Sequence, residues 1–154
     1  PQVRVDHPKE KTNLPQHQEL NQISKDVITF WVPLVDINKN NGGIYFRPKT
    51  HELGHVKYKD YHLSATAAGK KRVKILNKLF NKKENKKYKS ISPKLNAGDV
   101  VIFHSFIFHG TKPNRSNKVR WVYIARHNSI KTAPYLKKED YPLRIPYNED
   151  YNTI

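Results

Sequence analysis

Residues 27–35 (VITFWVPLV) constrain the possible folds of this chain more than any other stretch. They are rich in the β-branched and aromatic side chains that favour a β-strand. As a strand, the stretch presents two fairly apolar faces, with Phe30 and Val32 on one and Trp31 on the other. Strands that are apolar on both faces are typical of sheets covered on both sides. We therefore expect a sheet with protein packed on each side of it.

Turn signals and further short strands continue this pattern along the chain. The segment 38–43 (NKNNGG) is a dense turn signal before a return strand at 44–46, so we expect a β-hairpin with 27–35. Other expected strands are 2–6, 14–20, 100–103, 106–108 and 119–126. Apolar residues at helical spacing within 70–89 predict one short amphipathic helix, and 48–60 is a loop or a second. The chain of 154 residues is thus expected to form one mainly all-β domain, a sandwich or barrel.

Composition excludes some sites and partners. The chain has no cysteine, so a metal would have to be held by His, Asp or Glu. No apolar run approaches the roughly 20 residues of a membrane helix, and the lack of cysteine fits a cytoplasmic location. The net charge of +16 would attract anions, but it comes mostly from lysine, which A/T-rich codons favour. Nucleic acid is therefore the less favoured partner, and an anionic small molecule is mildly favoured.

Three residues form a candidate metal site. His17 and Glu19 are two apart, so on a strand both side chains project from one face. His109 can supply a second imidazole. Two histidines and one carboxylate on one face of a metal leave other positions open, an arrangement typical of non-haem Fe(II) oxygenases.

Arg120 is a candidate for binding a carboxylate. It lies in a strand at 119–126 whose two faces both look buried, so its guanidinium is expected to point into an apolar interior. An unpaired charge there would be very costly, and a carboxylate is the natural bidentate partner. The sequence assigns no protein acid to Arg120, and a bound small-molecule carboxylate would serve.

In these segments the chain resembles the phytanoyl-CoA dioxygenase family of Fe(II)/2-oxoglutarate-dependent oxygenases. The matching segments, in order, are 15–19 (PQHQE), 28–36 (ITFWVPLVD), 41–43 (NGG), 48–54 (PKTHELG), 97–104 (AGDVVIFH) and 109–120 (HGTKPNRSNKVR). Their order and spacing extend over most of the chain. The resemblance implies a double-stranded β-helix, the cupin-like jelly-roll. It further implies an oxygenase core at 1–128, without the N-terminal part of the family domain. The tail at 129–154 mixes Pro, Tyr and charged residues with no clean period, so we expect an irregular C-terminal arm packed on the core.

The resemblance also implies residue roles. His17, Glu19 and His109 match the iron ligands, and Arg120 matches the residue that binds the distal carboxylate of 2-oxoglutarate. Thr111 and Trp31 match residues of the cosubstrate pocket. The implied activity is hydroxylation of a C–H bond of a small molecule with O2, releasing succinate and carbon dioxide.

Glu19 departs from the aspartate of many members by one methylene. A related halogenase would have a small residue at this position, so Glu19 favours hydroxylation.

Two other functions stay open at this point. The segment 51–55 (HELGH) matches the H-E-x-x-H signature of zinc metallopeptidases through His51, Glu52 and His55, but that signature requires a helix and Gly54 interrupts it. A cupin-like metal- or ligand-binding protein without catalysis is the other alternative.

Overall fold

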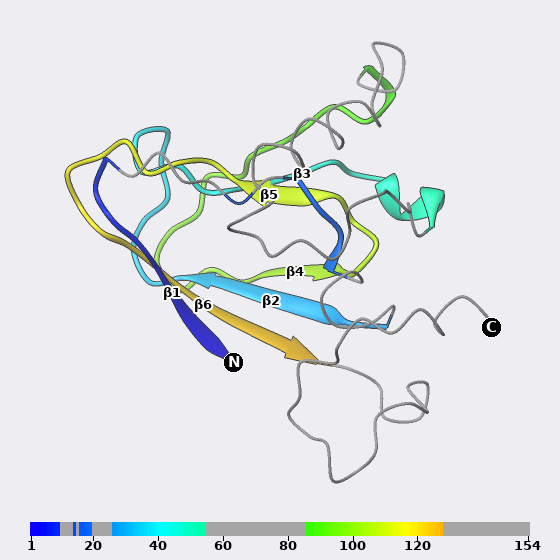
Figure 1. Ribbon diagram of the computed structural model, residues 1–154, viewed down its shortest axis with the longest axis horizontal. Helices are drawn as coiled ribbons and strands as arrows, with labels where there is room; N and C mark the ends of the chain where they lie inside the picture. Colours follow the sequence, from blue (N-terminus) through cyan, green and yellow to red (C-terminus); the bar gives the residue numbers. More distant parts are fainter. Residues whose placement is uncertain (10–13, 15, 20–25, 55–85, 128–154) are drawn as a thin grey trace, which may run out of the picture.

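The computed structural model describes residues 1–9, 14, 16–19, 26–54 and 86–127 (Figure 1). Strands dominate these residues, as the sequence predicts, and a short 3-10 helix lies at Thr50–Leu53. The strands are β1 (Gln2–Asp6), β2 (Ile28–Pro33), β3 (Ile44–Phe46), β4 (Val101–His104), β5 (His109–Thr111) and β6 (Arg120–His127). The mainly-β prediction is therefore confirmed.

The strands form two antiparallel sheets. Four of them make a sheet in the order β1-β6-β2-β4, and β3 pairs with β5 in a two-stranded sheet. Figure 1 shows the two sheets on opposite sides of the domain. Side chains from both form one apolar core: Trp31, Ile37, Ile44, Phe46, Phe103, Val122 and Ile124. The site described below lies beside this core.

The four-stranded sheet has one buried and one partly exposed face. On β6, Val122 is fully buried, whereas its neighbours Trp121 and Tyr123 are 43% and 38% exposed. On β2, Trp31 is 2% exposed and Ile28 is 41% exposed. The expectation of packing on both sides is therefore wrong for these positions, because apolar composition alone does not say which face lies on the core.

The expected hairpin is also wrong. Strand β2 pairs with β4 and β6, while β3 pairs with β5, so the two segments lie in different sheets. The turn between them is compact, because the Asn41 side chain donates to the Asp36 carbonyl (2.6 Å) and accepts from the Asn38 N–H (2.8 Å). It carries the chain from one sheet to the other.

The expected strand at 106–108 is displaced along the chain. Ile107 N–H donates to the His104 carbonyl (3.0 Å), which forms a turn, and the strand begins at His109. Of the expected helix at 70–89, residues 70–85 lie outside the described residues, as does the arm at 129–154. Among the described residues, none belongs to a helix with the length and hydropathy needed to span a membrane.

Candidate metal centre

His17 and His109 are brought together by backbone pairing. Each N–H donates to the carbonyl of the other, at 2.9 Å from His17 and 3.0 Å from His109. This pairing is an isolated antiparallel bridge. We expected a strand at 14–20, but residues 16–19 do not belong to a longer ladder. Opposed residues in such a pair project side chains to the same side. The two imidazole centroids accordingly lie 4.3 Å apart.

Glu19 is held in place by the segment around it. Its N–H donates to the Ser105 carbonyl (3.0 Å). The Gln18 side-chain amide donates to the carbonyls of Gly54 (2.8 Å) and Phe106 (2.9 Å). These bonds fix Gln18, which lies between His17 and Glu19 in the chain. Glu19 therefore projects towards the imidazoles although the segment is not a regular strand.

The three predicted ligands form one buried cluster. His17, Glu19 and His109 are 0%, 2% and 3% exposed. Glu19 Oε1 lies 3.3 Å from His109 Nε2 and 3.8 Å from His17 Nε2. One ligand atom from each residue lies within 4.8 Å of the other two. Among the described residues, this is the group that could hold a metal ion.

The protonation of His109 suits a metal ligand. Its Nδ1 lies 3.0 Å from the Ile107 carbonyl oxygen, which can only accept a hydrogen bond. Nδ1 must therefore carry a proton, which leaves Nε2 as the ring nitrogen that faces the cluster and would bind a metal. Metal-ligating histidines are commonly oriented in this way.

A fourth residue, Arg126, binds the same carboxylate. Its Nε donates to Glu19 Oε2 (3.0 Å) and its Nη2 donates to Oε1 (3.3 Å). Burial alone would raise the pKa of Glu19, but hydrogen bonds with His109 and His17 and the charge of Arg126 hold it well below its ordinary value. Glu19 is therefore an ionised ligand.

Sequence reasoning missed Arg126, although the signal was present. Arg120, Val122 and Ile124 share one face of the expected strand, and Arg126 is the next residue on that face.

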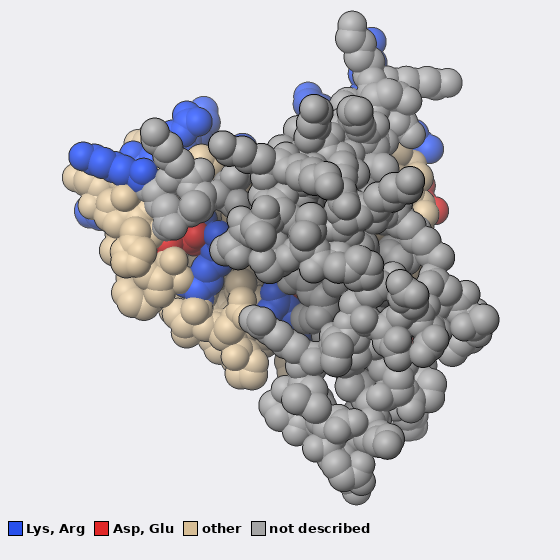
Figure 2. Space-filling view, in the orientation of Figure 1, with Lys and Arg blue, Asp and Glu red and all other residues tan. Residues whose placement is uncertain are grey.

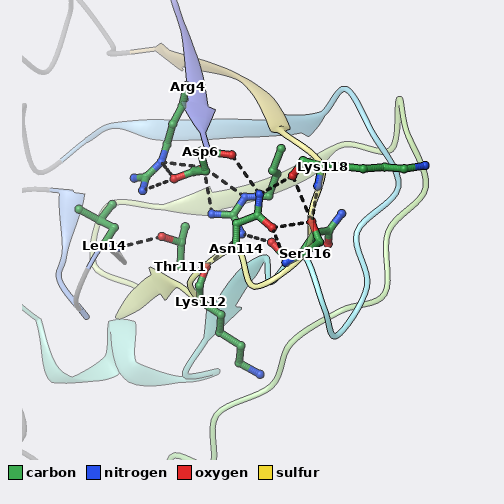
Figure 3. Close-up of polar contacts among 10 residues, drawn as sticks. Arg4, Asp6, Leu14, Thr111, Lys112, Asn114, Ser116 and Lys118 are labelled. Atoms are coloured by element: carbon green, nitrogen blue, oxygen red, sulfur yellow. Dashed lines mark hydrogen bonds and ion pairs between the residues drawn. The ribbon is translucent and has the colours of Figure 1, made fainter. Parts of the chain in front are cut away.

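Arg120 is fully buried, as expected, and its partners come from the protein. Its Nε (3.1 Å) and Nη2 (2.9 Å) bind Asp6 Oδ2, and its Nη1 donates to the carbonyls of Asn41 (2.6 Å) and Lys112 (3.0 Å). The sequence reasoning that left Arg120 without a protein acid was therefore wrong. Figure 3 shows Asp6 also bound by Arg4 from the same strand, whose Nη2 lies 2.8 Å from Oδ1.

The other two predicted cosubstrate residues, Thr111 and Trp31, are both buried. Thr111 is 3% exposed, and its Oγ1 accepts a hydrogen bond from the Leu14 N–H (3.0 Å), as Figure 3 shows. A hydroxyl that accepts one bond still has its own proton to donate. Trp31 belongs to the apolar core cluster.

The peptidase signature does not form the helix that it requires. His51 and Glu52 are exposed and lie in the 3-10 helix Thr50–Leu53, which ends at Gly54 with φ +62°. His55 lies outside the described residues. The described part of the signature, residues 51–54, is therefore not the α-helix that H-E-x-x-H requires.

Comparison with protein families gives a match over most of the chain. A model of the phytanoyl-CoA dioxygenase (PhyH) family matches residues 3–122. No curated protein sequence matches the chain at a significant level.

Several solved structures are similar to this one. SnoK, a non-heme alpha ketoglutarate dependent carbocyclase from nogalamycin biosynthesis, is 18% identical, with a TM-score of 0.61 over 82% of this chain and 47% of that one. EctD from S. alaskensis, solved with 2-oxoglutarate and 5-hydroxyectoine, is 13% identical, with a TM-score of 0.60 over 84% and 43%. The non-heme monooxygenase ThoJ is 16% identical, with a TM-score of 0.57 over 82% and 44%.

The chain spans less than half the length of each of these proteins. At such identities the likeness concerns the fold, and it confirms the predicted double-stranded β-helix.

Proposed function

Because this chain belongs to the phytanoyl-CoA dioxygenase family, we propose that it is an Fe(II)- and 2-oxoglutarate-dependent dioxygenase that hydroxylates a C–H bond of a small molecule. The observation that carries the proposal is the buried cluster of His17, Glu19 and His109. Enzymes of this family use Fe(II) with 2-oxoglutarate, and this donor set fits that metal.

Each ligand has a defined task in holding the metal. His17 and His109 would each donate through Nε2, and Glu19 Oε1 would complete one face. When bound, iron and 2-oxoglutarate supply the oxidising chemistry, with O2 as oxidant and succinate and carbon dioxide as coproducts. The protein contributes orientation, and burial of all three ligands separates them from bulk solvent.

Arg120 and Thr111 would orient the cosubstrate. Arg120 is the buried cation on the inner face of β6, and Thr111 is two residues beyond the ligand His109. In this proposal, Arg120 shares its guanidinium between Asp6 and the distal carboxylate of 2-oxoglutarate. Thr111 donates its hydroxyl proton to the same carboxylate, and Trp31 forms part of the apolar wall.

The substrate is proposed to be a small anionic molecule. Lysine and arginine side chains are visible at several places on the face seen in Figure 2, including its upper left, and few acidic side chains are visible there. A hollow of about 370 Å³ has Lys39, Lys94 and Lys112 among its lining residues. Such a positive field raises the local concentration of anions. A cytoplasmic location belongs to the same proposal.

Hydroxylation is chosen over the other reactions of similar folds. The similar solved structures include an epimerase and a carbocyclase. Glu19 occupies the ligand position with a carboxylate, which leaves no room there for a halide. Hydroxylation needs no device beyond the metal, its cosubstrate and a nearby C–H bond.

The test is anaerobic titration of the protein with Fe(II) and 2-oxoglutarate, following the visible charge-transfer band of the bound keto acid. We expect a band that is absent in His109→Ala and unchanged in His104→Ala, an exposed histidine outside the cluster. Succinate release would then be screened against small anions. A folded protein without the band would contradict the proposal and favour a binding protein without catalysis.

A further inference from the structure

The two oxygens of the Glu19 carboxylate have different neighbours. Glu19 Oε1 faces both imidazoles, whereas Oε2 receives the Arg126 Nε–H at 3.0 Å. We propose that Arg126 is a positioning residue that restricts Glu19 to a single metal-binding oxygen. This inference rests on the proposed function, because it concerns the same metal site.

The first argument is the number of positions around the metal. Carboxylates bind metals through either one oxygen or both. Two histidines and one carboxylate oxygen leave three positions of an octahedral metal open. A keto acid takes two of these, and O2 needs the third. If Glu19 bound through both oxygens, the cosubstrate and O2 could no longer bind together.

The second argument is the conformational freedom of the glutamate side chain. Its extra methylene gives the carboxylate more freedom to turn than an aspartate has. The Ser105 carbonyl fixes the backbone of Glu19 but does not fix the carboxylate plane. Arg126 supplies that restraint, since its Nε and Nη2 bind different oxygens in a fork.

The third argument is the place of Arg126 in the fold. It follows Arg120, Val122 and Ile124 on the inward face of β6, and its side chain is 19% exposed against 2% for Glu19. The Arg126 guanidinium thus reaches the buried carboxylate from a more exposed position on the same face of β6. A lysine there would keep the charge but could not bind both oxygens with fixed geometry.

Water-proton relaxation of the Mn(II)-loaded protein tests the proposal without cosubstrate. Three open positions hold three exchangeable waters, so Arg126→Met should lose about a third of the relaxivity as Glu19 takes up a second position. Arg126→Lys should show the same loss. Arg4→Met is the matched control, because it removes a similar arginine–carboxylate fork on Asp6 and should leave the relaxivity unchanged.

A double-mutant cycle gives a second readout. We expect Arg126→Met to weaken 2-oxoglutarate binding to the Co(II)-loaded protein at least tenfold, while Co(II) affinity stays within threefold. In a Glu19→Asp background, where the shorter carboxylate turns less freely, the same substitution should cost less than threefold. Calorimetric titration measures both affinities.

The outcomes separate the two proposals. Unchanged relaxivity in Arg126→Met, or equal losses of 2-oxoglutarate affinity in the wild-type and Glu19→Asp backgrounds, would overturn the role of Arg126. A parallel loss of metal and cosubstrate affinity would overturn it too, because it would indicate a general structural role. Wild-type protein that binds neither Mn(II) nor Co(II) at this site would instead overturn the proposed function.

Discussion

Asp6 and Arg120 are directly opposed residues of strands β1 and β6, and their side chains form a buried ion pair. Asp6 is 3% exposed and Arg120 is fully buried. Removing one partner of such a pair leaves an uncompensated buried charge. The pair thus ties the edge strand β1 to the sheet, and it ties folding to the residue proposed to bind cosubstrate.

Asp6→Asn should destabilise the protein by about 3 kcal/mol at neutral pH. Burial alone would raise the pKa of Asp6, but Arg4 and Arg120 hold it below the ordinary value of 3.8. A carboxyl with a lower folded pKa adds stability above its unfolded pKa, and this stability is lost as pH falls through the folded pKa. The difference between wild type and Asp6→Asn should therefore be full at neutral pH and shrink below pH 3.8. Urea unfolding across pH measures it, and a difference that does not change with pH would contradict the ion pair.

The same substitution should affect cosubstrate binding in the opposite direction. Asp6 and the distal carboxylate of 2-oxoglutarate would compete for the Arg120 guanidinium, since two of its nitrogens already bind Asp6. Asp6→Asn should therefore tighten 2-oxoglutarate binding to the metal-loaded protein several-fold. Calorimetric titration against wild type decides the point. Weaker binding would mean that Asp6 orients Arg120 instead of competing for it.

Thr111 should be replaceable by serine but not by valine. Its hydroxyl accepts from the Leu14 N–H, and a valine would leave that donor without its partner (Figure 3). We expect Thr111→Val to cost about 1–3 kcal/mol of unfolding free energy and to weaken 2-oxoglutarate binding. Thr111→Ser keeps the hydroxyl and should restore most of both. Equal losses in the two variants would indicate packing of the methyl group, and the hydroxyl would then have no special role.

Thr29 offers a case in which stability and binding should separate. It is 1% exposed, it opposes Arg126 across strands β2 and β6, and its Oγ1 has no hydrogen-bond partner among the described residues. Thr29→Val should leave stability unchanged or raise it by about 1 kcal/mol, because an unsatisfied buried hydroxyl is removed. If a ligand at the metal uses this hydroxyl, 2-oxoglutarate or substrate affinity should fall. Ligand affinity equal to that of wild type would exclude the contact.

The three residues of the candidate metal site could be picked out from the sequence because they lie in short, distinctive segments. His17 and Glu19 are two apart, and His109 precedes a Gly-Thr pair, so local spacing carries the information. Backbone pairing between His17 and His109 could not be predicted, since it joins segments far apart in the chain. The three residues lie together although residues 16–19 do not form a regular strand, so their role as metal ligands is a prediction that rests on side-chain chemistry.

Interactions between distant strands account for what the sequence did not reveal. Asp6 was the missing acid of Arg120, but only the β1–β6 register places the two residues opposite each other. Strand alternation indicates the face of β6 on which Arg126 lies, but nothing local relates Arg126 to Glu19. The hairpin error arose in the same way, since a strong turn signal does not specify whether the chain returns to its own sheet.

Gly42 should be among the least replaceable residues near Arg120. It has φ +69°, and a Cβ there would lie 2.5 Å from the Pro113 carbonyl oxygen, 2.7 Å from that of Lys112 and 2.8 Å from Arg120 Nη1. Two of these neighbours are backbone atoms, which cannot move aside cheaply. The clash would also displace the Lys112 carbonyl that Arg120 binds. Gly42→Ala should therefore cost more than backbone strain alone.

Gly98 provides the matched control for this prediction. It has φ +89°, but a Cβ there would meet no atom of the described residues within 4 Å. Gly98→Ala should cost only the strain of the left-handed backbone, about 1–2 kcal/mol. Gly42→Ala should cost about 3 kcal/mol or more in urea unfolding and should weaken 2-oxoglutarate binding. Equal costs in the two variants would show that the close approach of Gly42 to Arg120 does not limit substitution.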